Sequence, residues 1–175
     1  NLVASDTGSS GPWTFTAIVY ASMSPYYLMI DSWPSPDCVD FDLSIEMIPS
    51  NPGDDCINPI VVSIPGDLDY YTSDTTCGKL DDYYYTGLAP YDYGDDIIYE
   101  LVVTADTTVH FKADCLGEDY TGMGLFDDCP DVGNLLASDT NGWGETDPLE
   151  ITYTLLASES PYYLMLDSWP SPQCY

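Results

Sequence analysis

The chain has 175 residues, 45% of them hydrophobic, and its 30 Asp and Glu residues are set against only two Lys, for a net charge of −28. This length and apolar content suffice for a buried core and for an ordinary globular domain. A nucleic-acid partner is excluded and an anionic membrane is disfavoured, because both require clustered Lys and Arg, and no apolar run is long enough for a membrane span.

Two segments of the chain occur twice, once near its start and once near its end. NLVASDT begins at Asn1 and NLLASDT at Asn134, while PYYLMIDSWPSPDC begins at Pro25 and PYYLMLDSWPSPQC at Pro161. The second pair is 136 residues apart and the first 133, so a short insertion in NGWGETD accounts for the difference. A period this long is a whole domain rather than a solenoid unit. We therefore expect residues 1–50 to be the C-terminal part of one repeat, and residues 51–175 to be a second repeat that lacks its last strand.

Residues 39–48, VDFDLSIEMI, alternate apolar and polar side chains. This alternation is typical of a half-buried strand with an acidic outer face. Its apolar positions are Val39, Phe41, Leu43, Ile45 and Met47. Because neither copy of the repeat has a complete set of strands, two interpretations fit. Either the chain is a segment of a longer tandem array, or a neighbouring subunit supplies the missing strands, as in donor-strand addition to an open sheet edge.

Helix signals are almost absent, whereas short β-branched and aromatic runs recur between Asp, Gly and Pro turns at the spacing of a β-sandwich. In chain order, the expected strands are PIVVSI near Pro59, DDYYYTG near Asp81, DDIIYELVVT from Asp95, TTVHFKA from Thr107, TGMGLF from Thr121, LEITYTL from Leu149 and YYLMLDSW from Tyr162. Alternation predicts a core that contains Ile97, Tyr99, Leu101, Val103, Val109 and Phe111. It points Glu100, His110 and Lys112 outward.

Three of these stretches are similar to the bacterial pre-peptidase C-terminal domain family. They are GDDIIYELVVTADTTVHF, MGLFDDCPDVGNLLASDTN and SPYYLMLDSW, and the resemblance covers roughly Cys56–Cys174 and again Asn1–Met47. It implies an all-β, jelly-roll-like β-sandwich of secreted proteins, often appended to peptidases and sometimes calcium-binding. Here we expect one near-complete copy and one partial copy of this sandwich. The chain departs from the usual setting because no catalytic domain accompanies the sandwich, which favours a freestanding architectural role.

The six cysteines lie in Asp- and Gly-rich contexts without a CxxC pair, which indicates disulfides formed outside the cell or at its surface. Sequence alone does not choose among the possible pairings. We expect first Cys115 with Cys129, which flank a hairpin-like stretch, and then Cys56 with Cys77. Cys38 and Cys174 hold equivalent repeat positions and should have equivalent partners.

No catalytic constellation is present. The only His, His110, is predicted to lie on an outward strand position without a nearby nucleophile, and HExxH, P-loop and dinucleotide-binding motifs do not occur. With so many acidic residues, a suitably spaced carboxylate pair arises by chance. We therefore expect no enzymatic activity.

Calcium is the one cofactor that the composition suggests, because hard cations bind clustered carboxylates and carbonyl oxygens in loops. The candidate ligands are Asp127, Asp128, Asp131 and Asn134 in one loop, Asp139 and Asn141 in the next, and Asp95 and Asp96 before a strand. The competing interpretation is a solvated acidic face that keeps the protein soluble, or one adapted to high salt or low pH.

The repeated DSWPSP motif places Trp33 and Trp169 at equivalent positions. Exposed aromatic rings can stack on sugars, which would indicate carbohydrate binding, but the same rings also fill junctions between domains. We favour the junction. The sequence thus predicts a structural subunit of an extracellular filament or surface array, a head-to-tail homopolymer joined through residues 39–47, Trp33 and Trp169. The alternative is a secreted calcium- or carbohydrate-binding accessory module of a larger peptidase or adhesin.

Overall fold

The computed structural model describes residues 4–7, 12–15, 17, 19, 24–33, 40–46, 51–88 and 90–169. The chain forms two compact units, an N-terminal unit, Asn1–Glu46, and a C-terminal unit, Met47–Tyr175. Within the described residues, no helix is long and apolar enough to cross a membrane.

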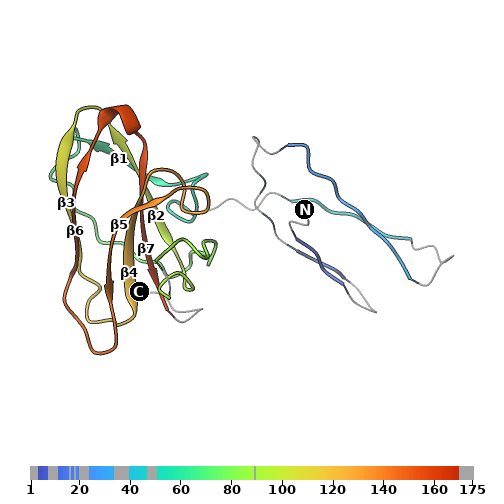
Figure 1. Cartoon of the computed structure of the whole chain (residues 1–175). Helices are drawn as coiled ribbons and strands as arrows, with labels where there is room; N and C mark the ends of the chain where they lie inside the picture. Colours follow the sequence, from blue (N-terminus) through green and yellow to red (C-terminus); the bar gives the residue numbers. More distant parts are fainter. Residues whose placement is uncertain are drawn as a thin grey trace. The chain divides into compact units, whose positions relative to one another are not determined.

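The C-terminal unit is an all-β sandwich (Figure 1). Its strands are β1 Ile60–Ile64, β2 Ile97–Val103, β3 Thr107–Ala113, β4 Thr121–Phe126, β5 Leu135–Asn141, β6 Leu149–Leu155 and β7 Tyr162–Ser168, with the 3₁₀ turn η2 Ala157–Glu159 between the last two. One sheet has the order β1-β2-β7-β4-β5 and the other pairs β3 with β6. Only β1 and β2 run parallel. The expected β-sandwich is therefore confirmed, while its jelly-roll connectivity stays a prediction.

The main core fills the space between the two sheets. Alternate residues of β2 face it, as predicted, and they meet Val109 of β3 and Ile151 of β6. Phe111 is partly buried against the same core. His110 and Lys112 lie on the exposed face of β3. The alternation of apolar residues thus identified the inner face of both sheets correctly.

A second apolar cluster covers the opposite face of the five-stranded sheet. Its buried members are Tyr83, Leu88, Ile98, Phe126, Cys129 and Met165. Three of them, Ile98, Phe126 and Met165, come from neighbouring strands and point away from the main core. Strand β7 is therefore covered on both faces, and most of its side chains are apolar, as is typical of a central strand.

The disulfide pairing expected from the sequence is wrong. Cys56 is bonded to Cys129, with 6.0 Å between their Cα atoms and 73 residues between them in sequence. Cys115 is buried in the main core, whereas Cys129 belongs to the cluster on the other face of the sheet, so the sheet itself separates the predicted partners. Cys77 is also disulfide-bonded, but not to Cys56. Cys38 and Cys174 lie outside the described residues.

Two strand predictions are also corrected by the structure. Residues 81–87 form no strand, because the backbone N–H groups of Asp82 and Tyr83 donate to a side chain, Oδ2 of Asp96, at 2.8 and 3.2 Å. Tyr83 instead turns inward, and its hydroxyl accepts a hydrogen bond from the Cys56 N–H at 2.8 Å. Conversely, Leu135–Asn141, where we predicted no strand and placed Asp139 and Asn141 in a loop, forms edge strand β5 beside β4.

The described part of the predicted strand 39–48 has no strand assignment. Of its residues, 40–46 are described, and none of these belongs to a strand. The apolar side chains of Phe41, Leu43 and Ile45 are 54%, 55% and 80% exposed. Val39 and Met47 lie outside the described residues.

Gly122 of β4 faces the second cluster, where the loop that precedes β2 passes close to the sheet. A Cβ atom on Gly122 would lie 2.9 Å from both Leu88 Cδ2 and Tyr91 Cβ. We expect Gly122→Ala to lower the free energy of unfolding by about 1–3 kcal/mol through overpacking, measured by urea denaturation. Gly66→Ala is the control, because its nearest neighbour would be Ser63 Cβ at 3.5 Å. Equal stabilities for the two variants would contradict this close approach.

Candidate functional site

The N-terminal unit exposes side chains whose counterparts in the repeat form the core of the C-terminal unit. Counting back 136 residues from β6 places Trp13, Phe15 and Val19 opposite Leu149, Ile151 and Leu155. The first three are 45%, 50% and 58% exposed, whereas their counterparts are 0%, 4% and 0% exposed. Apolar side chains at equivalent repeat positions thus face solvent in one copy and the core in the other.

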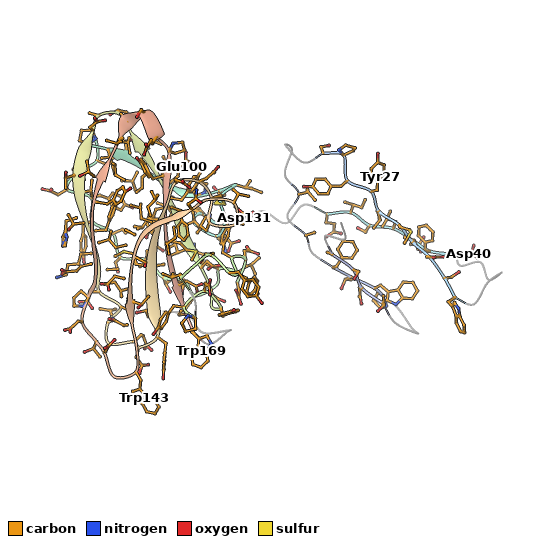
Figure 2. The ribbon with its side chains drawn as sticks, viewed as in Figure 1. Tyr27, Asp40, Glu100, Asp131, Trp143 and Trp169 are labelled. Atoms are coloured by element: carbon orange, nitrogen blue, oxygen red, sulfur yellow. A yellow bond between two sulfur atoms is a disulfide. The ribbon has the colours of Figure 1, made fainter. Side chains whose placement is uncertain are left out.

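The same contrast holds for the repeated PYYLM segment. Tyr26, Leu28 and Met29 are 36%, 49% and 83% exposed, whereas Tyr162, Leu164 and Met165 of β7 are 0%, 8% and 0% exposed. Strand β7 is the middle strand of its sheet, hydrogen-bonded to β2 on one side and β4 on the other. Described residues 24–33 belong to no strand, and the side chain of Tyr27 projects outward in the N-terminal unit (Figure 2). We call the exposed apolar side chains of these two segments the exposed repeat surface: Trp13, Phe15, Val19, Tyr26, Leu28 and Met29.

The N-terminal unit nevertheless reproduces two local contacts of the complete copy. The Thr14 N–H donates to Asp6 Oδ2 at 2.8 Å, as the Glu150 N–H donates to Asp139 Oδ2 at 2.7 Å. The Ser32 N–H donates to Asp31 Oδ1, as the Ser168 N–H donates to Asp167 Oδ1. These matches pair the same repeat positions in both units. The described residues of the N-terminal unit thus reproduce two of the hydrogen bonds that Asp139 and Asp167 accept in the other copy.

The two tryptophans predicted at subunit contacts differ in their surroundings. Trp33 is 90% exposed. Trp169 is 38% exposed, and its ring packs on Tyr120 with the ring centres 5.2 Å apart. Its backbone N–H also donates to the Tyr120 carbonyl at 2.9 Å. Trp143, which is 81% exposed, lies at the same end of the C-terminal unit (Figure 2). Subunit contacts at Trp33 and Trp169 stay a prediction.

A second candidate site is a group of carboxylates on the side of the sandwich where the second cluster lies. We call it the carboxylate cluster: Asp54, Asp55, Asp81, Asp82, Asp95, Asp96 and Asp167. Its members precede β1, precede β2 or end β7, and interact with one another through their charges. Asp96 and Asp167 are fully buried, and their carboxyl groups are in contact. Asp96 Oδ1 accepts no hydrogen bond from a protein donor.

Burial changes the acid–base properties of this cluster. Burial first, and then the charge of Asp167, raises the pKa of Asp96 well above its usual value. Burial likewise raises the pKa of Asp167 to about 7, against hydrogen bonds that lower it, including one of 3.1 Å from the Gly94 N–H. Burial, followed by the neighbouring carboxylates, raises the pKa of Asp82 to about 6. Two buried carboxyl groups in contact must be neutralised, either by a shared proton or by a cation.

In the first acidic loop, three of the predicted calcium ligands form hydrogen bonds within the fold: Asp127, Asp128 and Asn134. Asp127 accepts hydrogen bonds from the N–H and Nδ2 of Asn134 at 2.6 and 2.8 Å, which lower its pKa. Asp128 Oδ1 accepts a hydrogen bond from the Cys129 N–H. A surface depression is lined by Asp127, Asp128, Asn134, Val132, Leu136 and Glu159. Asp131 is exposed and does not line it.

The other predicted ligands divide between strand β5 and the carboxylate cluster. Asp139 and Asn141 lie in β5, where Asp139 accepts N–H groups of Thr140 and Glu150. Asn141 Nδ2 donates to the Asp147 carbonyl at 2.6 Å. Asp95 and Asp96 belong to the carboxylate cluster. Within the residues that the structure describes, no three His, Cys, Asp or Glu side chains form a ready-made metal shell.

Sequence reasoning missed most of the carboxylate cluster, although two signals pointed to it. Asp-Asp pairs occur in GDDC, LDDYYY and GDDII, so three loops each bring two carboxylates. Asp167 also interrupts the otherwise apolar strand YYLMLDS, where a charge is out of place unless it has a partner.

His110 lies apart from both candidate sites. Its Nδ1 is 2.9 Å from Thr152 Oγ1, and its Nε2 is 3.9 Å from Glu150, which also contacts Lys112 at 3.1 Å. This is an exposed cross-strand arrangement on the β3–β6 sheet.

Comparison of the chain with protein-family models, with curated proteins and with solved structures found no match. The exposed repeat surface and the carboxylate cluster are therefore the features that bear on its function.

Proposed function

We propose that the protein is a structural subunit of an extracellular filament or surface array, which polymerises head-to-tail by completing β-sandwich domains between subunits. The observation that carries this proposal is the exposed repeat surface. Side chains that form the core in one copy of the repeat face solvent in the other, over two separate segments.

Physical considerations support a covered state for this surface. Burying a Leu, Phe or Met side chain stabilises a protein by about 1.5–3 kcal/mol, and contiguous exposed apolar surface commonly marks an interaction site. Residues 26–32 belong to no strand in this unit, although the same sequence forms a central strand in the other copy. Phe41, Leu43 and Ile45 add a further exposed apolar row in the same unit.

The Cys56–Cys129 disulfide supports the extracellular part of the proposal, because such bonds persist mainly in oxidising compartments. The paucity of basic residues leaves a large net negative charge, so association between copies must come from apolar burial and backbone pairing rather than from charge attraction.

Electron microscopy of the native, unreduced protein at low concentration tests the proposal. Regular filaments whose axial repeat matches one subunit are the expected result. Dispersed particles over a range of salt concentrations and pH values would refute polymerisation, and the chain would then be better described as a stretch of a modular secreted protein.

Calcium binding is the second candidate function, and it is favoured by the buried contact between Asp96 and Asp167. Oxygen atoms of carboxylates and backbone carbonyls are the ligands that Ca²⁺ prefers, usually six to eight of them. Asp96 and Asp167 would supply two carboxylates, and the surrounding members of the carboxylate cluster would add negative charge. The ion would stabilise the junction of the segment before β1, the start of β2 and the end of β7.

A chelator experiment tests calcium binding and its location. At low ionic strength, we expect excess Ca²⁺ to raise the melting temperature of the chelated protein by roughly 10 °C, because a ligand at a hundred times its Kd contributes about 2.7 kcal/mol. Asp96→Asn should abolish this response. Asp131→Asn, in the exposed loop, should retain it. A melting temperature that is unchanged by chelation would exclude a stabilising calcium ion.

A further inference from the structure

Three tyrosine rings meet on the loop that precedes β2. The ring centres of Tyr84 and Tyr93 are 5.9 Å apart with an angle of 57° between the ring planes, and those of Tyr85 and Tyr93 are 6.0 Å apart at 86°. Tyr84 and Tyr85 are 48% and 83% exposed, and Tyr93 is partly exposed. We call these three side chains the tyrosine corner. Their rings are steeply inclined to one another and form no flat platform.

The loop is fixed on both sides of the corner by a buried contact. Asp92 Oδ2 accepts hydrogen bonds from the N–H and the hydroxyl of Thr86 at 2.8 and 3.1 Å, and both residues are buried. Thr86 follows Tyr85 and Asp92 precedes Tyr93, so this contact holds the two rings near each other. Tyr85 has a φ of 60°, a conformation that is strained for a bulky residue. A strained and mostly exposed ring on a fixed base does little for packing, which favours a role in binding.

Carboxylates surround the tyrosine corner. The Tyr84 hydroxyl interacts with the Asp81 carboxylate, and the charge of Asp82 also acts on it. The charge of Asp92 acts on Tyr93, and Asp92 Oδ1 is buried and accepts no hydrogen bond within the described part of the chain. The face of an aromatic ring also has a negative potential. The rings and the carboxylates therefore attract the same kind of ligand, which is a cation.

The lysines of the chain are engaged elsewhere. The sequence has only two, Lys79 and Lys112, and no Arg. Lys79 Nζ donates to the Pro52 carbonyl, and Lys112 lies on β3 with its Nζ 3.1 Å from Glu150. An external cation that carries methyl groups fits the corner best, because it offers apolar surface to the rings together with its charge. We propose that the tyrosine corner binds an alkylated ammonium group, the chemistry shared by choline and by methylated lysine side chains.

The inclination of the rings favours this ligand over a sugar. A pyranose has flat faces and stacks on one ring or on rings that lie in one plane, whereas the planes here differ by 57° and 86°. A compact, nearly spherical ammonium group contacts two inclined ring faces at once. The tyrosine corner shares no residue with the exposed repeat surface, so this inference is independent of polymerisation.

Titration of the full chain with choline, followed by nuclear magnetic resonance, tests the site. The methyl protons of choline should shift upfield, because they would lie over the ring faces. The uncharged isostere, in which a tert-butyl group replaces the trimethylammonium group, should bind about tenfold more weakly or not at all. This comparison separates attraction of the charge from apolar contact.

Two tyrosine variants locate the site. Tyr85→Leu removes a ring but keeps an apolar side chain, and it should weaken choline binding by about 3- to 30-fold. Its melting temperature should stay at the wild-type value, because Tyr85 is mostly exposed. Tyr71→Leu is the matched control, since Tyr71 is 90% exposed and lies outside the tyrosine corner. This variant should bind choline as the wild type does.

Several outcomes would overturn the proposal. They are an isostere that binds as well as choline, choline binding that is unchanged in Tyr85→Leu, and a chito-oligosaccharide that binds through Tyr85 while choline does not. Under the proposal, a peptide that contains trimethyllysine also binds, and the unmethylated peptide binds more weakly. Tighter binding of the methylated peptide than of choline would identify a protein side chain as the source of the group. The reverse order would identify a small molecule or a lipid headgroup.

Discussion

Phe15→Asp is expected to abolish filament formation while leaving the C-terminal unit as stable as in the wild type. Phe15 is half exposed in the single chain, so a carboxylate there is solvated and tolerated. In the completed sandwich it would hold the place of Ile151, which is 4% exposed in the main core. An unpaired buried charge costs about 3–5 kcal/mol, which raises the protein concentration needed for assembly by about 10²–10⁴-fold.

Thr14→Asp is the matched control for this substitution. Thr14 neighbours Phe15, and its counterpart Glu150 is an exposed, charged residue on the outer face of β6. The same added charge should therefore leave assembly close to the wild type, measured by sedimentation and electron microscopy at matched concentrations. Filaments of Phe15→Asp that form as readily as those of Thr14→Asp would show that this face does not enter a core between subunits.

The strands that could be located from sequence alone are those in which every second side chain packs against a core. TTVHFKA, TGMGLF and LEITYTL become β3, β4 and β6 with the predicted limits. β5 was missed because LLASDTN lies at a sheet edge, where polar residues and small side chains are tolerated. DDYYYTG was assigned wrongly because high strand propensity was outweighed by the Asp96 carboxylate, which takes the backbone N–H groups that a sheet would need.

The repeat could be read directly from the sequence, but its consequence could not. Identical strings predict identical structures only where their partners are also present. Residues 162–168 have β2 and β4 beside them and form a central strand, whereas described residues 26–32 form none. The difference between the two copies is thus tertiary, and it carries the functional argument.

The second face of the sheet was the least predictable part of the fold. The Cys56–Cys129 bond and the contact between Asp96 and Asp167 both join residues more than 70 positions apart, and Cys56, Cys129 and Asp96 lie in loops. Such pairings depend on which loops cover which face, and local pattern carries no information about that. The acidic loops chosen from the sequence instead use their carboxylates to hold neighbouring backbone N–H groups, which is a common role for Asp in turns.

Without divalent cations, the C-terminal unit is expected to be more stable at pH 5 than at pH 8. Asp167 has a pKa of about 7 in the folded protein, against about 4 in an unfolded chain. A carboxyl group with a raised folded-state pKa stabilises the fold fully below its unfolded-state pKa, and this contribution is lost as the pH rises through the folded-state value. From below pH 4 to above pH 7, the titration of Asp167 would lower the free energy of unfolding by about 4 kcal/mol. The raised pKa values of Asp96 and Asp82 act in the same direction.

Thermal unfolding in a chelating buffer from pH 4 to pH 8 measures this dependence, and Asp167→Asn provides the control. The amide removes the titrating group but retains an acceptor for the Gly94 N–H, so the pH dependence should become shallower and the stability at pH 8 should rise. A melting temperature that rises from pH 5 to pH 8 in chelator would contradict the burial of a carboxyl pair.

Calcium should reverse the direction of this pH effect, because a cation favours the ionised carboxylates that a shared proton would otherwise neutralise. In excess Ca²⁺, the melting temperature of the wild type should therefore no longer fall toward pH 8, whereas Asp167→Asn should respond little. If Ca²⁺ leaves the pH profile of the wild type unchanged, the pair holds a proton and not a metal. The junction of β2 and β7 would then be strongest in acid.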